Sequence, residues 1–385
     1  MACAKTCGQA VGGVVDNAKI LIIGGGIGGL TAAIALRQRG YEVEVIEKDP
    51  DWTVYGVGII QQSNVIRCMS QLGILDEYLA AAFGFDCVDV FLPDGRHAVR
   101  VSSPTLVEGK PANLGVSRPA LHKVLGDSAI RAGAKVRLGV TATALNDDGE
   151  GVTARFSGGS EGRYDLVVGA DGLYSDTRSK IFTDPPQPEF TGQSVWRYNF
   201  PRTDDVDCLK SYEGPVGVGL VPLSQTLMYM FVTTPEPGNP RYPREGLAKE
   251  MRSKLDGAAP AMAALAEQIT DDTGVVYKPQ ECVFLEGDWH SGRIVLLGDA
   301  VHATTPHLGQ GAGMAIEDAV VLADELARAA DPEAAFRAYR ERRFERCRFI
   351  ITTSRALCDS QLGKGPRLDQ AKATAEAFTV MARPI

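Results

Sequence analysis

The sequence predicts an α/β protein in which a parallel sheet is interrupted by a separate, mostly antiparallel sheet and is followed by C-terminal helices. Near the N-terminus a strand, a helix and a second strand follow one another over residues 19–48, and such a crossover joins parallel strands of one sheet. Between residues 187 and 283, prolines, glycines and strand-like stretches multiply. An apolar strand returns at 293–297, and two helical stretches follow it.

The first unit is defined by its residue patterns. Lys19–Ile23 (KILII) is an apolar strand that runs straight into glycines, and Thr31–Arg39 is a helix of small and apolar residues closed by Gly40. Glu42–Lys48 (EVEVIEK) alternates in polarity as a strand does. We expect residues 1–18 to be a disordered lead-in.

The remaining elements follow from periodicity and turn signals. Before residue 187 we expect helices at 64–72 and 119–132 and strands at 87–92, 98–101, 135–138, 152–156 and 165–168. Between residues 187 and 283 we expect strands at 194–200, 216–221 and 226–232 and a helical signal at 246–268. A strand at 293–297 and helices at 311–329 and 332–357 complete the chain.

This order divides the chain into two discontinuous domains and a tail. The first domain comprises 19–75, 111–183 and 284–330. The second comprises 76–110 and 184–283, and residues 331–385 form a C-terminal helical segment.

The bulk composition excludes several classes of protein. The net charge of −8 argues against nucleic acid or an anionic membrane as a partner. No apolar run reaches the ~18 residues of a membrane-spanning helix, and the N-terminal residues lack a secretory signal pattern. The eight cysteines form no C-x-x-C pair and no zinc-type cluster. We therefore expect no metal, reduced thiols and a cytoplasmic location.

A glycine motif points to a dinucleotide. Gly24–Gly29 contains G-x-G-x-x-G as Gly24, Gly26 and Gly29. The first glycine permits a tight turn, the second lets the backbone approach a pyrophosphate, and the third lets helix and strand pack closely. Glu47 ends the second strand, where an acid accepts hydrogen bonds from a ribose. The pattern predicts a Rossmann-like domain but does not separate NAD from FAD.

Two further stretches extend this pattern. Asp165–Arg178 (DLVVGADGLYSDTR) is a strand that enters a tight turn, and Gly292–His302 (GRIVLLGDAVH) is a strand that ends in Gly298-Asp299. With the glycine motif, in this order, they resemble the class A flavoprotein aromatic monooxygenases of the para-hydroxybenzoate hydroxylase type. In size the chain is most similar to the salicylate, urate and 6-hydroxynicotinate hydroxylases. The resemblance covers roughly residues 19–345 and implies a Rossmann-like FAD-binding domain with an inserted, mostly antiparallel substrate domain.

The resemblance also implies which residues hold non-covalent FAD. Arg118 is similar to a family arginine that contacts the cofactor, and Asp299 to the residue that bonds the ribityl chain. Asp171 has a mainly structural role near the pyrophosphate in the family. The implied cofactor residues are Gly24, Gly26, Gly28, Gly29, Glu47, Lys48, Gly58, Arg118, Asp171, Asp299, Gly309, Gly311 and Ala312.

The segment Pro306–Gly313 (PHLGQGAG) has its own physical logic. Its glycines let the backbone lie against a flat ring, and a helix that begins near Gly311 directs its positive end towards that ring. Reduced flavin is anionic near N1, so a helix N-terminus there stabilises it. In the similar family segment at Gly56–Asn64, Ser63 replaces a usual proline, and a looser loop is expected.

The implied reaction uses NADH or NADPH and O2. In such enzymes the reduced flavin forms a C4a-hydroperoxide that hydroxylates an electron-rich ring. The resemblance therefore implies a small phenolic or N-heteroaromatic substrate, and a base or a relay within hydrogen-bond reach of it is expected.

Candidates for the substrate site follow from position. Tyr229 matches a substrate-facing tyrosine of the urate- and hydroxynicotinate-type enzymes, with a core aromatic as the plainer alternative. His307 follows Pro306 on the flavin-lining loop, where relatives carry variable polar residues. Tyr229, His307 and Pro306 are the catalytic candidates. Arg197, which would suit a substrate carboxylate if it points inward, joins Tyr212 and Gln61 as the candidates for substrate binding.

Other functions explain less of the sequence. A hydride-transferring dehydrogenase leaves Gly298-Asp299 and Gly309–Gly313 without a role, a flavin halogenase would show a Trp-x-Trp-x-Ile-Pro segment, and a membrane epoxidase would need an apolar anchor. A non-hydroxylating FAD-dependent oxidoreductase and a flavin-binding protein without monooxygenase activity stay open. So do the substrate, the choice between NADH and NADPH, and whether the protein is a monomer or a homodimer.

Overall fold

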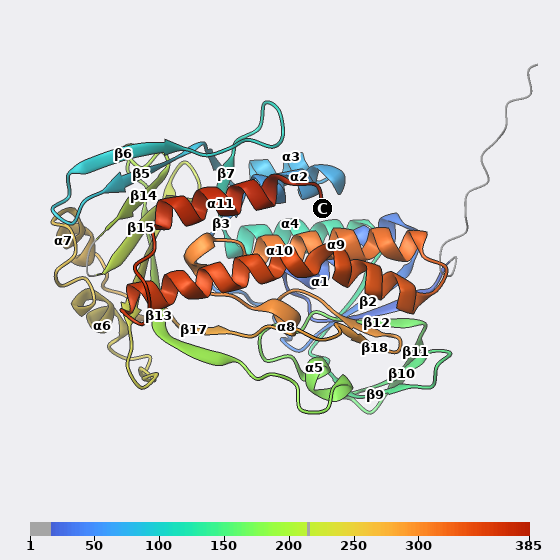
Figure 1. Ribbon diagram of the computed structural model, residues 1–385. Helices are drawn as coiled ribbons and strands as arrows, with labels where there is room; N and C mark the ends of the chain where they lie inside the picture. Colours follow the sequence, from blue (N-terminus) through green and yellow to red (C-terminus); the bar gives the residue numbers. More distant parts are fainter. Residues whose placement is uncertain (1–16, 214–215) are drawn as a thin grey trace, which may run out of the picture.

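The computed structural model describes residues 17–213 and 216–385 (Figure 1). Its first sheet has six strands in the order β18-β19-β12-β1-β2-β8, and all pairs but the edge pair β18–β19 are parallel. The strands are β1 (Lys19–Ile23), β2 (Glu42–Glu47), β8 (Lys135–Leu138), β12 (Leu166–Gly169), β18 (His290–Ser291) and β19 (Ile294–Leu296). The predicted α/β fold with a mostly parallel sheet is confirmed.

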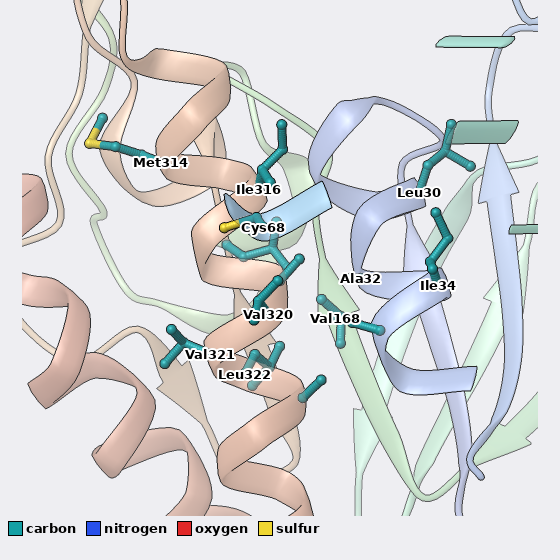
Figure 2. Packing of buried hydrophobic residues seen from close by; sticks show 14 of the residues in the cluster. Leu30, Ala32, Ile34, Cys68, Val168, Met314, Ile316, Val320, Val321 and Leu322 are labelled. Atoms are coloured by element: carbon teal, nitrogen blue, oxygen red, sulfur yellow. The ribbon is translucent and has the colours of Figure 1, made fainter. Parts of the chain in front are cut away.

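Helices bury one face of this sheet. The helix α1 (Ile27–Gln38) packs against both α4 (Arg118–Arg131) and α9 (Gly311–Arg328). Figure 2 shows buried apolar residues on both helices, among them Leu30 and Ile34 of α1 and Ile316 and Val320 of α9. Small residues allow the close approach, because Ala32, Ala33 and Ala35 of α1 are all buried.

The second sheet has seven strands in the order β17-β13-β16-β15-β14-β5-β6. They are β5 (Cys87–Phe91), β6 (His97–Ser102), β13 (Glu189–Pro201), β14 (Leu209–Tyr212), β15 (Gly217–Pro222), β16 (Leu227–Pro235) and β17 (Val276–Cys282). Only β14 and β5 pair in parallel. The predicted mostly antiparallel sheet is confirmed, and Figure 1 shows it at the opposite end of the molecule from β2 and β12.

Smaller elements connect and cover the two sheets. A three-stranded sheet joins β3 (Gly58–Gln62), β7 (Asn113–Ser117) and β4 (Phe83–Phe85), and another joins β9 (Ala142–Asp147), β10 (Val152–Phe156) and β11 (Glu161–Tyr164). The helices α2 (Ser63–Gln71), α3 (Leu75–Ala80), α5 (Asp176–Ile181), α6 (Leu247–Ser253), α7 (Ala261–Ala266), α8 (Asp299–His302), α10 (Pro332–Gln361) and α11 (Gln370–Ala382) complete the fold, with 3-10 turns at Asp272–Gly274 and Pro306–Leu308. Among the helices described here, none is both long and apolar enough to cross a membrane.

Some predicted boundaries are wrong. Ala18, placed in the lead-in, is 2% exposed, and its carbonyl accepts a hydrogen bond from the Glu42 N–H. Residues 1–16 of that segment lie outside the described part of the chain. The signal at 246–268 is two short helices, because the chain turns at Gly257, which has φ +82°. The division into domains by residue range stays a prediction.

Candidate active site

A cavity of about 1700 Å³ lies where the two sheets meet. The glycine turn before α1 lines it, together with the start of α9 and one face of the seven-stranded sheet. Residues of α11, including Thr374 and Phe378, also line it. Most of the motifs identified in the sequence therefore share one space.

The glycine motif has the division of roles that its spacing predicts. A Cβ on Gly24 would lie 2.4 Å from the Ala170 carbonyl oxygen, and one on Gly29 would lie 2.0 Å from the Gly24 oxygen. These two glycines therefore permit close packing. A Cβ on Gly26 would meet no described atom within 4 Å, and Gly26 and Gly28 line the cavity. The second glycine thus leaves room for a phosphate at the N-terminus of α1.

Glu47 ends β2 beside this turn. Its Oε2 accepts a 2.8 Å hydrogen bond from the Gly25 N–H, and its Oε1 accepts a 2.9 Å bond from the Asp49 N–H. The carboxylate therefore lies where a dinucleotide ribose is expected. Lys48, which was predicted to share this role, is exposed, and neither Glu47 nor Lys48 is part of the cavity lining, so the roles of both stay predictions. One step along an extended chain turns the side chain to the other side.

Two charged side chains face the cavity without a side-chain partner among the described residues. They are Arg118, the first residue of α4, and Asp299, the first residue of α8. Burial lowers the pKa of Arg118 and raises the pKa of Asp299, because each charge is surrounded by protein. Charges held in this way are costly unless something pairs with them. The pair therefore marks the place of a polar ligand.

The loop that leads into α9 lines the cavity along its backbone. Pro306, Gly309, Gly311 and Ala312 all take part in the lining. Gly309 has φ +65°, a left-handed conformation that glycine adopts readily. Since α9 begins at Gly311, the unpaired N–H groups of its first turn lie at the cavity wall and favour negative charge there.

One face of the seven-stranded sheet brings Arg197 and Tyr229 together. Arg197 lies opposite Phe231, and Asn199 lies opposite Tyr229, so all four side chains share a face. Burial, followed by the nearby charge of Arg118, lowers the pKa of Arg197 to about 10, so Arg197 stays charged at neutral pH. Burial raises the pKa of Tyr229 against the opposing effect of the two arginines. Tyr229 is therefore a neutral phenol next to two cations.

The strand β3 supports Tyr229 and corrects one prediction. A Cβ on Gly58 would lie 2.3 Å from Cδ1 of Tyr229, so only glycine lets the ring pack there. Gln61, predicted to bind substrate, is 1% exposed and lies outside the lining, whereas its neighbour Gln62 lines the cavity and donates a 3.1 Å hydrogen bond to the Leu308 carbonyl. Alternate residues of a strand face opposite sides of the sheet. Gln62, one position after the predicted Gln61, is the residue that faces the cavity.

Tyr212 was also predicted to bind substrate. Although residue 212 borders the cavity, its ring stacks on Phe91 with centroids 4.6 Å apart and belongs to the apolar cluster beneath α6 and α7. Ser211, one position earlier, shares the cavity face with Phe231. The ring of Tyr212 thus packs in the cluster beneath α6 and α7, and its predicted role in substrate binding stays a prediction.

Asp171 makes local hydrogen bonds after β12, and its role near a pyrophosphate stays a prediction. Its Oδ1 accepts a 2.5 Å hydrogen bond from the Ser175 hydroxyl, and its Oδ2 accepts a 2.8 Å bond from the Thr177 N–H. The carboxylate therefore fixes the start of α5 beside the glycine turn. Ser63, where a looser loop was expected, is also held firmly: its hydroxyl lies 2.6 Å from the Pro104 carbonyl and 2.8 Å from that of Ala112.

His307 lines the cavity, but both ring nitrogens are engaged. Nδ1 lies 2.9 Å from the Thr305 hydroxyl, and Nε2 lies 3.1 Å from Oε1 of Gln361. Gln361 Oε1 also accepts a 3.0 Å bond from Gln193, so Nε2 of His307 carries the proton and Nδ1 accepts from Thr305. Burial lowers the pKa of His307 to about 4. Because both ring nitrogens are hydrogen-bonded and the pKa is low, His307 holds the loop in position and is poorly suited to accept a proton.

The sequence did not reveal the polar residues that surround His307. Gln193 on β13, Gln361 at the end of α10 and Gln370 at the start of α11 all line the cavity. The amide of Gln370 donates a 2.9 Å hydrogen bond to the His307 carbonyl. No motif marks these glutamines; a hint lay only in the amphipathic pattern of residues 370–382.

A buried ion network holds the loop at Gly298–His302 to α9. Oδ2 of Asp318 accepts hydrogen bonds from the Gly298 N–H at 2.9 Å and from His302 Nε2 at 2.5 Å, while Oδ1 accepts from Arg343 Nε at 2.7 Å. Neighbouring Glu317 accepts from Arg343 Nη1 at 2.6 Å. All four charged side chains have 0% exposure. The network therefore fixes the peptide that precedes Asp299.

This architecture defines the class of protein. A Rossmann-like sheet presents a glycine turn and a helix N-terminus to a cavity that also holds the unpartnered Arg118 and Asp299. The space beside Gly26 and the backbone at Gly309 suit a pyrophosphate and a flat ring. These residues fit FAD, and the molecule is an enzyme of the flavoprotein type.

The comparisons with known proteins agree with this class. A family model described as an FAD binding domain matches residues 17–354, and the chain belongs to this family. It is 31% identical to the "Putative FAD-dependent monooxygenase YetM" of Bacillus subtilis, covering 91% of this chain and 96% of that protein. It is 32% identical to an FAD-dependent urate hydroxylase of Klebsiella pneumoniae, covering 92% and 93%.

Solved structures lead to the same result. The chain superposes on Klebsiella pneumoniae HpxO complexed with FAD and uric acid with a TM-score of 0.81 at 28% identity, covering 95% of this chain and 92% of that one. A variant of HpxO complexed with FAD gives a TM-score of 0.82 at 28% identity, with 95% and 94% covered. The predicted resemblance is therefore confirmed. The protein is a single-component, class A flavin-dependent monooxygenase, and FAD is its cofactor.

Proposed function

We propose that the protein hydroxylates a small phenolic or N-heteroaromatic ring that binds as an anion, and that it consumes O2 and NADH or NADPH. One observation carries the proposal: Arg197 and Arg118, both without side-chain partners among the described residues, converge on the hydroxyl-bearing ring of Tyr229 in the cavity of the FAD motifs. Two buried guanidinium groups that form no ion pair among the described residues favour an anionic ligand.

The chemistry of known relatives supports an anionic ring substrate. One relative acts on urate, and another, at 32% identity over 88% of this chain and 87% of that protein, is a 3-amino-4-hydroxybenzoate 2-monooxygenase of Streptomyces platensis. Both names describe rings that carry acidic groups. The alternative of a flavoprotein that does not hydroxylate has no comparable support from the cavity.

The residues of this chain divide the work of the reaction. Bound FAD supplies the two-electron and oxygen chemistry. Arg118 and Asp299 hold the cofactor together with the turn at Gly26, and the α9 N-terminus stabilises negative charge on its ring. Arg197 binds the anionic group of the substrate. Tyr229 donates its hydroxyl proton in a hydrogen bond to the ring substituent and so orients the ring.

The cations replace the general base that the sequence predicted. Neither Tyr229, whose pKa is raised, nor His307, whose pKa is lowered to about 4, suits a base at neutral pH. The positive potential of two arginines instead lowers the pKa of a bound phenol or lactam, so the substrate ionises on binding. An ionised ring is the more electron-rich one, as hydroxylation requires.

A matched pair of ligands tests the proposal. We expect benzoates, pyridine carboxylates and purine diones to accelerate NAD(P)H oxidation and to yield hydroxylated products, and we expect their carboxamide or N-methylated analogues to bind more weakly by about one to two decades. The measurement is product formed per NAD(P)H consumed across the panel. Equal affinity for neutral and anionic analogues would refute the anionic substrate. The cytoplasmic location stays a prediction, and the preferred nicotinamide and the choice of monomer or homodimer stay open.

A further inference from the structure

Two cysteines that are far apart in the sequence become neighbours in the fold. The strands β5 and β14 pair in parallel with Val88 opposite Leu209. Cys87 is the first residue of β5 and Cys208 directly precedes β14, so the two residues lie at the same end of this pairing, and their thiols are in hydrogen-bond contact. Paired strands lie roughly 4.8 Å apart, and a disulfide needs a Cα separation of roughly 4.4–6.8 Å. The backbone therefore already meets the main geometric condition for a disulfide.

The two thiols differ in access. Cys208 is 0% exposed, whereas Cys87 is partly exposed, and both belong to the apolar cluster that contains Tyr229. Burial raises the pKa of Cys208, and its contacts with the Cys87 thiol and the Asp89 carboxylate add to this. Cys87 is thus the sulfur that a small oxidant reaches first, and Cys208 lies behind it.

Polar groups surround the buried thiol. Sγ of Cys208 donates to Oδ2 of Asp89 at 3.4 Å, and Nη2 of Arg100 lies 3.9 Å from the same sulfur. Arg100 also donates two hydrogen bonds to Asp89, at 2.8 and 2.6 Å, and His97 Nε2 lies 3.0 Å from it. Because the Asp89 carboxylate already accepts the hydrogen bond of the Cys208 thiol, it is placed to take up the thiol proton. Arg100, half exposed, is a cation beside the same sulfur.

We propose that Cys87 and Cys208 form an oxidisable dithiol that closes to a disulfide under peroxide. In the first step the Cys87 sulfur attacks hydrogen peroxide, the O–O bond breaks, and Cys87 becomes a sulfenic acid with release of one water. In the second step the Cys208 sulfur attacks the Cys87 sulfur, and the S–O bond breaks. The hydroxyl leaves as a second water with the Cys208 proton, which passes by way of Asp89. Two thiols are oxidised and one peroxide is reduced.

The disulfide would join β5 to the start of β14, two neighbouring strands near one edge of the seven-stranded sheet. On their other face the same strands place Val88, Val90 and Leu209 in the cavity wall. The disulfide would therefore fix the spacing of two wall strands next to Tyr229. The inference does not depend on the proposed substrate, because peroxide is added as a reagent.

The test uses the full FAD-loaded chain. After treatment with a small molar excess of hydrogen peroxide, we expect the number of titratable thiols to fall by two. Peptide mapping should show a linkage between Cys87 and Cys208, and dithiothreitol should reverse it. In C208S, oxidation should stop at a sulfenic acid on Cys87 that dimedone traps. C282S, which removes another partly exposed thiol, should behave as wild type.

Two results would overturn the proposal. One is a wild-type protein that loses thiols without any peptide linking Cys87 to Cys208. The other is a C87S variant that loses the same number of thiols, at the same rate, as wild type. Because Cys87 is only partly buried, C87S is expected to fold, and its FAD content verifies this. Should C208S fail to fold, the wild-type peptide map and C87S still decide.

Discussion

At the residue scale, the surroundings of Arg197 and Tyr229 set the protonation of the reacting groups. Burial and the nearby charge of Arg118 lower the pKa of Arg197, but a pKa of about 10 still leaves Arg197 charged at neutral pH. The phenol of Tyr229 stays protonated, because burial raises its pKa. Of Arg197, Tyr229 and a bound acidic substrate, the substrate is thus the group that loses its proton most easily.

Replacing Arg197 by Gln should move the pH dependence of catalysis. The cation favours the ionised substrate, so its loss raises the substrate pKa on the enzyme. The acidic limb of the kcat profile should therefore shift to higher pH, by about one unit if the cation contributes ~1.4 kcal/mol. R197K keeps the charge and should restore most of the shift. A profile of R197Q that coincides with wild type would show that Arg197 does not touch the substrate.

Tyr229→Phe should spare FAD binding and reduction but lower the yield of hydroxylated product. The ring volume that packs on Gly58 stays, and only the hydroxyl is lost. A hydrogen bond of this kind is worth about 0.5–1.5 kcal/mol, so we expect a loss of roughly two- to tenfold in coupled turnover. Product per NAD(P)H is the measurement. Wild-type coupling in Y229F would leave Tyr229 as core packing alone.

Asp299→Ala should weaken FAD binding without unfolding the protein. Asp299 faces the cavity, whereas the neighbouring backbone is held by Asp318. A lost hydrogen bond to a charged group costs roughly 1.5–3 kcal/mol, or about one to two decades in affinity. Titration of the apoprotein with FAD, followed by flavin fluorescence, measures this directly, and an unchanged Kd would remove Asp299 from the cofactor site.

At the element scale, α9 and α10 form a clamp that holds the loop at Gly298–His302 in place. The acids Glu317 and Asp318 lie side by side on α9, and Arg343 of α10 bonds to both. The nearby cations His302 and Arg343 hold the pKa of Asp318 well below its usual range, against the effect of burial. A depressed carboxyl pKa stabilises the fold above the unfolded pKa of about 4 and loses this contribution as the pH falls through the folded value. The clamp is therefore fully formed at neutral pH.

Arg343→Met should destabilise the protein strongly, because it leaves two buried carboxylates without their shared cation. Breaking a buried pair in this way costs roughly 3–5 kcal/mol in the free energy of unfolding. The control is R337M on the same helix, since Arg337 pairs with Glu333 in solvent, and such a pair is worth about 0–1 kcal/mol. Urea titration of both variants tests the difference. Equal effects would show that the buried network contributes no more than a surface pair.

At the scale of the whole molecule, the sequence predicted the elements better than their contacts. The apolar strands of the parallel sheet and the glycine motif carry local signals, and the structure places them as expected. The strands β3 and β7 were missed because glycine, glutamine and asparagine weaken their patterns. Gln61 was assigned to the wrong face, since strand register depends on partners far away in the chain. The cavity glutamines on α10 and α11 and the Cys87–Cys208 pair likewise depend on contacts between residues far apart in the chain.

The most direct test of the whole account is the source of the oxygen atom in the product. With an anionic ring substrate, NAD(P)H and ¹⁸O₂, we predict one ¹⁸O atom in each hydroxylated product and the remaining oxygen atom of O2 in water. Mass spectrometry of the product reads this out. If every ring substrate leaves the reaction unlabelled while NAD(P)H is consumed and all the O2 appears as hydrogen peroxide, the protein oxidises NAD(P)H without hydroxylating, and the central claim is contradicted.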